Sequence, residues 1–212
     1  EGVASAVLSL DDLYLTHAAR GELGRKVHPL LRTRGVPGTH DVALGLATIA
    51  ALERGEGAIL PRFDKGRDDR APESEWPSAP PHTRLLIFEG WCMGAEAQPD
   101  AGLAQPVNDL ERDEDPRAIW RRYANQALAT EYRPLFARLD VLILLAAPGF
   151  DVVRDWRIEQ EQSLRRAGAP AAMDDAQIAR FIQHYERLTR HILEEMPGRA
   201  DLVAWLGQDR SA

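Results

Sequence analysis

Four short apolar runs constrain the fold of this chain more than any other feature. They occupy residues 6–10, 85–88, 141–147 and 202–206, and each has the length of a β-strand. Their apolarity is continuous rather than alternating, which is typical of strands covered on both faces, as in a parallel sheet. The longest run is much shorter than the roughly 18–20 apolar residues that cross a bilayer, so we expect no membrane-spanning segment.

Helical patterns with readable ends lie between these runs. In each pattern an acidic residue that favours the N-cap position precedes apolar residues at helical spacing. The predicted starts are Asp41, Asp115 with Pro116 at the first helical position, and Asp174 with Gln177 as its capping-box partner. The predicted ends are Gly55, a break or kink near Tyr132 caused by Pro134, and Pro197 with Gly198. Strands that alternate with helices favour a layered α/β fold with helices on both faces of a mainly parallel sheet.

The charge balance narrows the class of function. The 212 residues contain 26 Lys and Arg against 33 Asp and Glu, which gives a net charge of −7. This acidic balance argues against a protein that binds nucleic acid through its overall charge. Hydrophobic residues make up 44% of the chain, enough for a sizeable core, and the length suits one α/β domain or a domain with a lid.

Cysteine and histidine usage exclude two further kinds of site. The single cysteine, Cys92, excludes an intramolecular disulfide framework and fits a reducing compartment. The six histidines show no metal-ligand spacing, which argues against a zinc site. The first residues lack the basic start and the long apolar segment of a secretion signal. We therefore expect a soluble, cytoplasmic protein that has no membrane partner.

Acidic residues follow two of the predicted strands. The first strand runs directly into Asp11 and Asp12, and the second into Glu89. In open parallel sheets, ligands bind outside the carboxyl ends of the strands, so these acids are predicted to share one edge. Two carboxylates there have the chemistry to hold Mg²⁺ and to take a proton from a substrate hydroxyl. The alternative is that they only start loops or cap helices.

Three charged residues form a column on a predicted helix. Arg157, Glu161 and Arg165 are spaced four residues apart, which places them on one side of that helix. One interpretation is a salt-bridge ladder on the surface. The other is a mobile lid whose guanidinium groups close over phosphates.

Two polar stretches are candidates for a binding loop. The segment 61–82 is charged and rich in proline, and a loop of this length inside a compact domain is usually functional or mobile. The segment 34–41 is a turn-rich stretch that ends in His40 and Asp41. Asp41 is explained as an N-cap, whereas His40 either contacts an anionic ligand or makes a structural hydrogen bond.

Six sequence blocks occur in a fixed order along the chain. They are SLDDLYLT at 9–16, HPLL at 28–31, RGVPGTHD at 34–41, PRFDK at 61–65 with Asp69 and Arg70, FEGWCMG at 88–94, and WR with QE within 156–161. In content and order these blocks resemble the glycerate kinase family of P-loop kinases, the plant-type D-glycerate 3-kinases and their bacterial relatives. More distantly, the chain is similar to uridine kinase, pantothenate kinase and phosphoribulokinase.

The resemblance implies a function and a fold. The function is ATP-dependent transfer of the γ-phosphoryl group to a hydroxyl of a small hydroxy acid, D-glycerate in the best-known members. The fold is a P-loop kinase-like, three-layer α/β/α domain with a mainly parallel sheet and a helical lid. A single domain would then span 1–212, with an acceptor-binding insertion at about 28–82 and the lid at about 154–172.

The resemblance also implies roles for individual residues. Asp11 matches the general base, Glu89 the acid near Mg²⁺ and the acceptor, and Arg157 a catalytic residue of the lid. Asp11 and Glu89 would hold Mg²⁺, and Arg157 with Arg165 would bind ATP. The residues that would bind the acceptor are Asp12, Tyr14, Arg34, His40, Asp41, Lys65, Arg70 and Trp91.

One departure from the family is large. The phosphate-binding loop G-x-x-x-x-G-K-[ST] does not occur, and neither Lys26 nor Lys65, the two lysines, follows a matching glycine loop. In the family this loop and its strand precede the block at 9–16. We therefore expect the natural protein to carry a further N-terminal strand–loop–helix unit of roughly 30–40 residues.

Two alternatives to a glycerate kinase stay open at this point. One is a kinase of another small metabolite, such as a nucleoside or pantothenate. The other is an inactive family member that acts as a binding scaffold. The expected partners are ATP and a small acceptor, without nucleic acid, and the sequence does not indicate an oligomeric state.

Overall fold

The chain forms two compact units. The computed structural model describes residues 2–166 and 173–211, apart from the side chains of 160, 161 and 163–166. Unit 1 comprises Glu1–Met93 and Tyr123–Arg138, and unit 2 comprises Gly94–Arg122 and Leu139–Ala212. The single domain expected over residues 1–212 stays a prediction.

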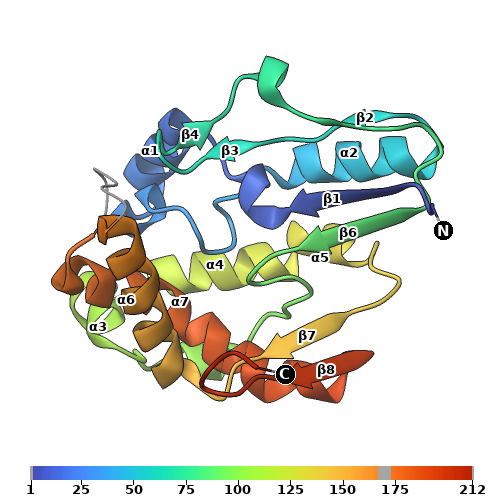
Figure 1. The fold of residues 1–212 in the computed structure, drawn as a ribbon. Helices are drawn as coiled ribbons and strands as arrows, with labels where there is room; N and C mark the ends of the chain where they lie inside the picture. Colours follow the sequence, from blue (N-terminus) through green and yellow to red (C-terminus); the bar gives the residue numbers. More distant parts are fainter. Residues whose placement is uncertain (1, 167–172, 212) are drawn as a thin grey trace. The chain divides into compact units, whose positions relative to one another are not determined.

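Unit 1 is built on a pair of parallel strands. Strand β1 (Ser5–Ser9) pairs with β6 (Leu85–Glu89), and the register places Ser9 opposite Glu89 (Figure 1). Two short antiparallel pairs, β2 with β5 and β3 with β4, lie in the connection between these strands. The other elements of unit 1 are η1 (Leu10–Leu13), α1 (His17–Lys26), η2 (Pro29–Arg32), α2 (Val42–Glu53), β2 (Ala58–Ile59), β3 (Phe63–Asp64), β4 (Asp69–Arg70), η3 (Glu73–Glu75), β5 (Ser78–Ala79) and α5 (Tyr132–Phe136).

Unit 2 contains a second parallel pair. Strand β7 (Ile143–Ala146) pairs with β8 (Leu202–Trp205). Helices α6 (Phe150–Arg166) and α7 (Asp175–Glu195) lie between them in the chain and pack on each other through Phe150, Ile178 and Ile182. The other elements are η4 (Asp100–Leu103), α3 (Asp109–Glu114), η5 (Met196–Gly198) and α4 (Ile119–Ala129), which begins in unit 2 and ends in unit 1. The predicted parallel pairing and the α/β fold class are confirmed.

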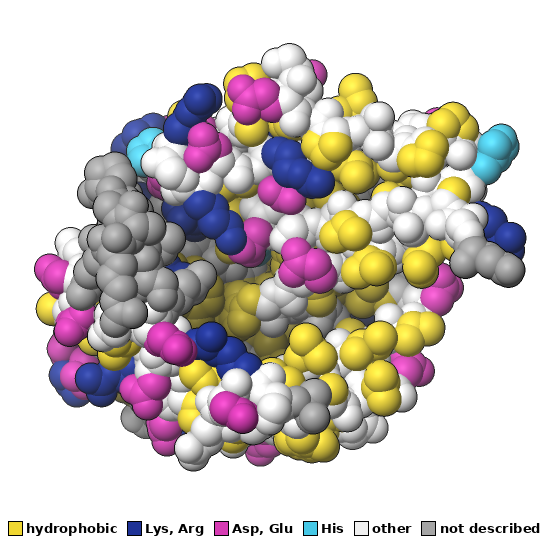
Figure 2. All heavy atoms as spheres, viewed as in Figure 1, with side chains coloured by type: hydrophobic (Ala, Val, Ile, Leu, Met, Phe, Trp, Pro, Cys, Tyr) yellow, Lys and Arg dark blue, Asp and Glu magenta, His cyan; other side chains and the backbone are white. Residues whose placement is uncertain are grey.

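The strands are covered on one face only, within the part of the chain that the structure describes. On β1 the side chain of Leu8 is fully buried, whereas Val7 is 51% exposed, and Ile87 on β6 is 50% exposed. Successive side chains of a strand point to opposite faces, so these residues define an apolar face open to solvent (Figure 2). The same alternation occurs on β7, where Leu144 is buried and Leu145 is exposed. The expectation of two covered faces therefore does not hold for these strands.

Two of the three predicted helix starts are confirmed. The carboxylate of Asp41 accepts a hydrogen bond from the Leu44 N–H at 3.0 Å and caps α2, which ends before Gly55 at a φ of 75°. Asp174 and Gln177 form the predicted capping box of α7. In both cases a local hydrogen bond between neighbouring residues is enough to define the helix end.

The third predicted start is wrong. Helix α4 begins at Ile119 and not after Pro116, because Ala118 adopts a φ of 58°, which no right-handed helix contains. Asp115 still caps α4 from outside it, since its carboxylate accepts from the Trp120 and Arg121 N–H groups at 3.0 and 3.2 Å. The predicted break near Tyr132 is present, with Pro134 in the first turn of α5, where its missing N–H has no intrahelical partner.

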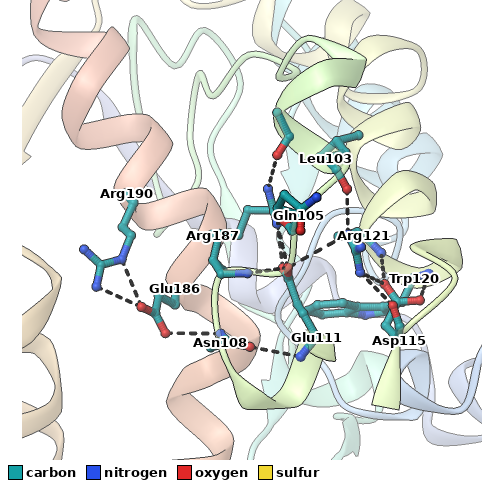
Figure 3. A network of polar contacts seen from close by, with 12 residues as sticks. Leu103, Gln105, Asn108, Glu111, Asp115, Trp120, Arg121, Glu186, Arg187 and Arg190 are labelled. Atoms are coloured by element: carbon teal, nitrogen blue, oxygen red, sulfur yellow. Dashed lines mark hydrogen bonds and ion pairs between the residues drawn. The ribbon is translucent and has the colours of Figure 1, made fainter. Parts of the chain in front are cut away.

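A network of charged residues ties the loops of unit 2 to α7 (Figure 3). Arg187 of α7 donates to both carboxylate oxygens of Glu111, at 2.7 and 2.6 Å, and to the carbonyl of Gly102 at 2.7 Å. Arg121 donates to the carbonyl of Leu103 at 2.8 Å. Both arginines therefore bind carbonyl groups at the end of η4, where a helix leaves such groups without an intrahelical partner.

None of the described helices combines the length and the apolarity that crossing a bilayer demands.

Candidate active site

The carboxyl ends of β1 and β6 bring the predicted acids to one edge of unit 1. Asp11 and Asp12 lie in η1, which follows β1 directly and begins with a hydrogen bond from the Asp11 N–H to the Ser9 hydroxyl at 3.3 Å. Glu89 is the last residue of β6, and it lies opposite Ser9 in the parallel register. The predicted shared edge is confirmed.

Asp11 is held in place by two donors. Its Oδ1 accepts from the Tyr14 hydroxyl at 2.9 Å, and its Oδ2 accepts from the Lys65 ammonium at 2.6 Å. Burial acts to raise the pKa of Asp11, but the hydrogen bond and charge of Lys65, assisted by Tyr14, outweigh it and hold the pKa below its usual range. Asp11 is therefore ionised at neutral pH and able to accept a proton.

Asp12 has a different set of partners. Its Oδ1 accepts from the Phe63 N–H at 3.0 Å, and its Oδ2 accepts from Arg62 Nη1 at 3.0 Å. Burial raises the pKa of Asp12, and the Phe63 N–H and Arg62 only partly offset it. Both oxygens thus anchor β3, and the role of Asp12 in acceptor binding stays a prediction.

The predicted cations of unit 1 each lie against an acid. Arg34 pairs with Asp68, and Arg70 pairs with Asp41 at 3.1 Å, while Lys65 pairs with Asp11. The cluster is therefore balanced in charge rather than simply cationic. One donor differs from the others, because Nε of Arg70 is buried and has no hydrogen-bond partner among the described residues.

His40 is not one of these cations. Burial lowers the pKa of His40 to about 3, so its ring is neutral, and of the two roles expected for His40 the structure shows the structural hydrogen bond. Its Nδ1 lies 2.5 Å from the Tyr132 hydroxyl, and its ring stacks on Tyr14 at a centroid distance of 4.5 Å. His40 thus supports the tyrosine that donates to Asp11.

Arg20 is a residue that the sequence did not reveal. It belongs to α1 and is only 1% exposed. Its guanidinium donates to the carbonyls of Leu15, Arg32 and Asp68 at 3.1, 3.1 and 2.6 Å. An arginine in a short, strongly polar helix is usually solvated, so no pattern distinguished it.

The remaining predicted residues lie in the turn after β6, in unit 2, or outside the described residues. Trp91 lies in the turn after β6. Arg157 belongs to α6 of unit 2, where its guanidinium lies 5.5 Å from the Phe181 ring centroid. The side chain of Arg165 and the last part of the predicted lid, residues 167–172, lie outside the described residues. The role of the lid stays a prediction.

The donor set at the edge of unit 1 fits one magnesium ion. Within the described residues, no group of three or more His, Cys, Asp or Glu side chains is placed to hold a metal. Mg²⁺ does not need such a group, because it is commonly bound by one or two carboxylates together with substrate phosphates and water. Asp11 and the exposed carboxylate of Glu89 offer that number of ligands.

Comparisons with known proteins identify similar kinases. No protein-family model matches the chain. It is 35% identical to the uncharacterized kinase mug58 of Schizosaccharomyces pombe over 187 residues, which cover 84% of this chain and 66% of that protein. It is 31% identical to the chloroplastic D-glycerate 3-kinase of Arabidopsis thaliana over 192 residues, which cover 85% of this chain and 39% of that protein. The chain thus spans less than two thirds of the length of these relatives.

Solved structures agree with the sequence relatives. The D-glycerate 3-kinase from Cryptococcus neoformans var. grubii superimposes with a TM-score of 0.81 at 26% identity, covering 99% of this chain and 78% of that one. The YGR205w protein superimposes with a TM-score of 0.69 at 23% identity, covering 98% and 75%, and supports the fold alone. Fold and strand-end acids together define a P-loop kinase-like α/β protein. Within that class, the chain belongs to the glycerate kinase family.

Proposed function

We propose that this protein is an ATP-dependent kinase that transfers the γ-phosphoryl group to a hydroxyl of a small hydroxy acid, with D-glycerate as the leading acceptor. The observation that carries the proposal is the ionised Asp11 carboxylate at the carboxyl edge of the strands, fixed by Tyr14 and Lys65. Membership of the glycerate kinase family supports the choice of reaction and acceptor.

In this proposal Asp11 accepts the proton of the acceptor hydroxyl. Tyr14 fixes one carboxylate oxygen, so the other is oriented toward Lys65 and an incoming ligand. A positioned base of this kind contributes about 10²–10⁴-fold to a proton-transfer step. Glu89 lies at the next strand end and would hold Mg²⁺ together with Asp11.

The acceptor carboxylate would be bound by cations of unit 1. Lys65 is 60% exposed, and Arg70 offers its unpartnered Nε in addition to the nitrogen that pairs with Asp41. A carboxylate is the ligand that best satisfies an orphan guanidinium donor. A neutral nucleoside has carbonyl and hydroxyl oxygens that could accept from this donor, but it has no negative charge to pair with Lys65 and Arg70, which favours a hydroxy acid as acceptor.

ATP and Mg²⁺ would complete the site. ATP would supply the γ-phosphoryl group, and Mg²⁺ would offset the negative charge of the phosphates. Arg157 and Arg165 are the residues of this chain that we propose for the nucleotide. We also propose a cytoplasmic location, because the single cysteine is fully buried and requires no oxidising compartment.

The test is a comparison of acceptors. The protein, produced from its complete coding sequence, is given ATP and Mg²⁺ with D-glycerate, pantothenate or uridine, and ADP release is measured for each. We expect kcat/KM for D-glycerate to exceed that for uridine by about 100-fold or more, because uridine lacks the carboxylate that would make charge-assisted hydrogen bonds with Lys65 and Arg70. Preference for uridine would contradict the binding of an acceptor carboxylate by Lys65 and Arg70. Preference for pantothenate would agree with that binding but change the acceptor. Binding of D-glycerate without any turnover would indicate the scaffold.

A further inference from the structure

The contact between Lys65 and Asp11 depends on a short hairpin. Lys65 is the first residue of the four-residue loop between β3 and β4, and it is separated from Asp11 by 54 positions in the chain. Its side chain is long and 60% exposed. An exposed ammonium on a flexible stem makes a weak ion pair unless its backbone is fixed. The position of the loop therefore decides whether Lys65 reaches Asp11.

Asp64 shapes the first half of this loop. Its Oδ1 accepts hydrogen bonds from the Gly66 N–H at 2.8 Å and from the Arg67 N–H at 3.1 Å. Such a local turn sets the curvature of the loop, but it does not attach the loop to the rest of the unit.

Asp68 ends the loop in an unusual conformation. It has a φ of 54°, in the left-handed region that residues other than glycine adopt at a cost of about 1–2 kcal/mol. Such a conformation persists where the surrounding contacts enforce it. The Asp68 carboxylate lies beside three basic side chains, Arg20 at 3.0 Å, His17 at 3.1 Å, and Arg34.

Arg20 connects this loop end to the segment that carries Asp11. Its Nη2 donates to the Asp68 carbonyl at 2.6 Å, and its Nε donates to the Leu15 carbonyl at 3.1 Å. Leu15 follows Tyr14, which donates to Asp11. Because a guanidinium is planar and its donors have a fixed geometry, one buried arginine sets the distance between the two segments.

We propose that Arg20 is a positioning residue that holds Lys65 against Asp11 through its ion pair with the Asp68 carboxylate, which supports its hydrogen bond to the Asp68 carbonyl. The kinetic consequence rests on the proposed function, whereas the placement of Lys65 does not. Arg20 acts through Asp68 on the residue that binds the acceptor carboxylate. Small errors in the placement of such groups lower the rate of the catalysed step. We therefore expect loss of the contact between Arg20 and Asp68 to lower turnover.

The test uses Asp68 rather than Arg20, because removal of a buried arginine risks unfolding. In Asp68→Gly, glycine adopts the left-handed conformation without strain, so the turn is kept while its carboxylate is lost. Asp68→Asn keeps a hydrogen-bond acceptor and tolerates the same conformation, so it is the conservative rescue. Glu56→Gln is the control, since Glu56 also belongs to unit 1 and pairs with exposed Arg54 rather than with either lysine.

The first readout requires no activity. Limited acylation of the protein, without ATP or Mg²⁺, is followed by mass spectrometry at Lys65, with Lys26 as the internal reference. We expect the Lys65 to Lys26 ratio to rise about threefold to tenfold in Asp68→Gly, to return most of the way in Asp68→Asn, and to stay unchanged in Glu56→Gln. Asp11→Asn removes the carboxylate that pairs with Lys65, so this variant gives the ratio expected for a fully released Lys65. An unchanged ratio in Asp68→Gly would overturn the proposal.

The second readout is the split between kcat and KM. We expect Asp68→Gly to lower kcat about tenfold and to raise KM for the acceptor less than that. A rise in KM alone would mean that Asp68 serves binding only and would overturn the positioning role. If the acylation ratio rises while the wild-type protein phosphorylates no acceptor, the positioning role of Arg20 is supported and the proposed function fails.

Discussion

Unit 1 and unit 2 each contain a network of charged side chains, and the two networks differ in their exposure to solvent. In unit 1 the side chain of Asp11 is 33% exposed and that of its partner Lys65 is 60% exposed. In unit 2 the side chain of Glu111 is 0% exposed and that of Arg187 is 10% exposed. The residue types are alike, so exposure is what separates the two networks.

This difference indicates what each network does. Removing one partner of a buried ion pair leaves an uncompensated charge, which is strongly destabilising. A half-exposed pair stabilises the fold little, but its groups are accessible to a ligand. We therefore assign stability to the network around Glu111 and chemistry to the pair of Asp11 and Lys65.

The largest effect is expected from the buried network. Glu111→Gln should lower the free energy of unfolding by about 3–5 kcal/mol, because Arg187 and Arg121 lose their shared counter-charge inside the protein. Urea denaturation measures this loss. Asp113→Asn is the control on the same helix, since Asp113 is exposed and pairs only with Arg112, and it should change stability by less than about 0.5 kcal/mol. Equal effects of the two variants would remove the distinction between the networks.

A second effect concerns the pH dependence of unit 2. Burial lowers the pKa of His184 to about 4, from 6.5 in the unfolded chain. Between these values the unfolded state binds more protons than the folded state, so stability falls as the pH falls. From pH 7.5 to 4.5 this one histidine should remove about 2.5 kcal/mol from the free energy of unfolding.

His184→Phe should abolish the part of the pH dependence of stability that His184 causes, because phenylalanine keeps the ring contact with Trp120 but cannot take up a proton. The exposed His82, which has a φ of 57°, provides the control His82→Asn, and this variant should keep the wild-type pH dependence. Denaturation curves at the two pH values test both variants. The same slope in His184→Phe and in wild type would contradict the account of His184.

The smallest effect sharpens the assignment of unit 1. Lys65→Met should raise KM for the acceptor about tenfold, because one charge-assisted hydrogen bond to its carboxylate is lost. Stability should change by less than about 1 kcal/mol, since the pair with Asp11 is half-exposed. Lys26→Met is the matched control, and steady-state kinetics with varied acceptor measure both. An unchanged KM would mean that Lys65 does not bind the acceptor.

Local features of this structure were readable from the sequence. The caps at Asp41 and Asp174 depend on hydrogen bonds across three residues, so residue type and spacing suffice to predict them. The acids at the strand ends follow from the apolar runs that precede them. Asp115 caps α4 through residues five and six positions further on, because the turn at Ala118 separates it from the helix. Spacing rules for an N-cap therefore predict a start that is too early.

Features that join distant segments were not readable. Lys65 meets Asp11 across 54 positions, and Arg20 reaches Asp68 across 48. Neither partner differs in type from the many charged residues that remain solvated. The neutral state of His40 likewise depends on burial against Tyr132, which lies 92 positions away. Such pairings arise from the tertiary fold, which a single sequence does not encode locally.

The measurement that tests the central claim most directly is the turnover of Asp11→Asn beside that of Asp12→Asn. The two residues are adjacent, and the substitutions are nearly isosteric, but Asp12 anchors β3 through Phe63 and Arg62. With ATP and D-glycerate, Asp11→Asn should lower kcat by about 10²–10⁴-fold while the free energy of unfolding changes by less than about 1 kcal/mol. Asp12→Asn should keep kcat within about tenfold of wild type, because its side chain still accepts from the Phe63 N–H. Turnover of Asp11→Asn within tenfold of wild type would contradict the assignment of chemistry to Asp11.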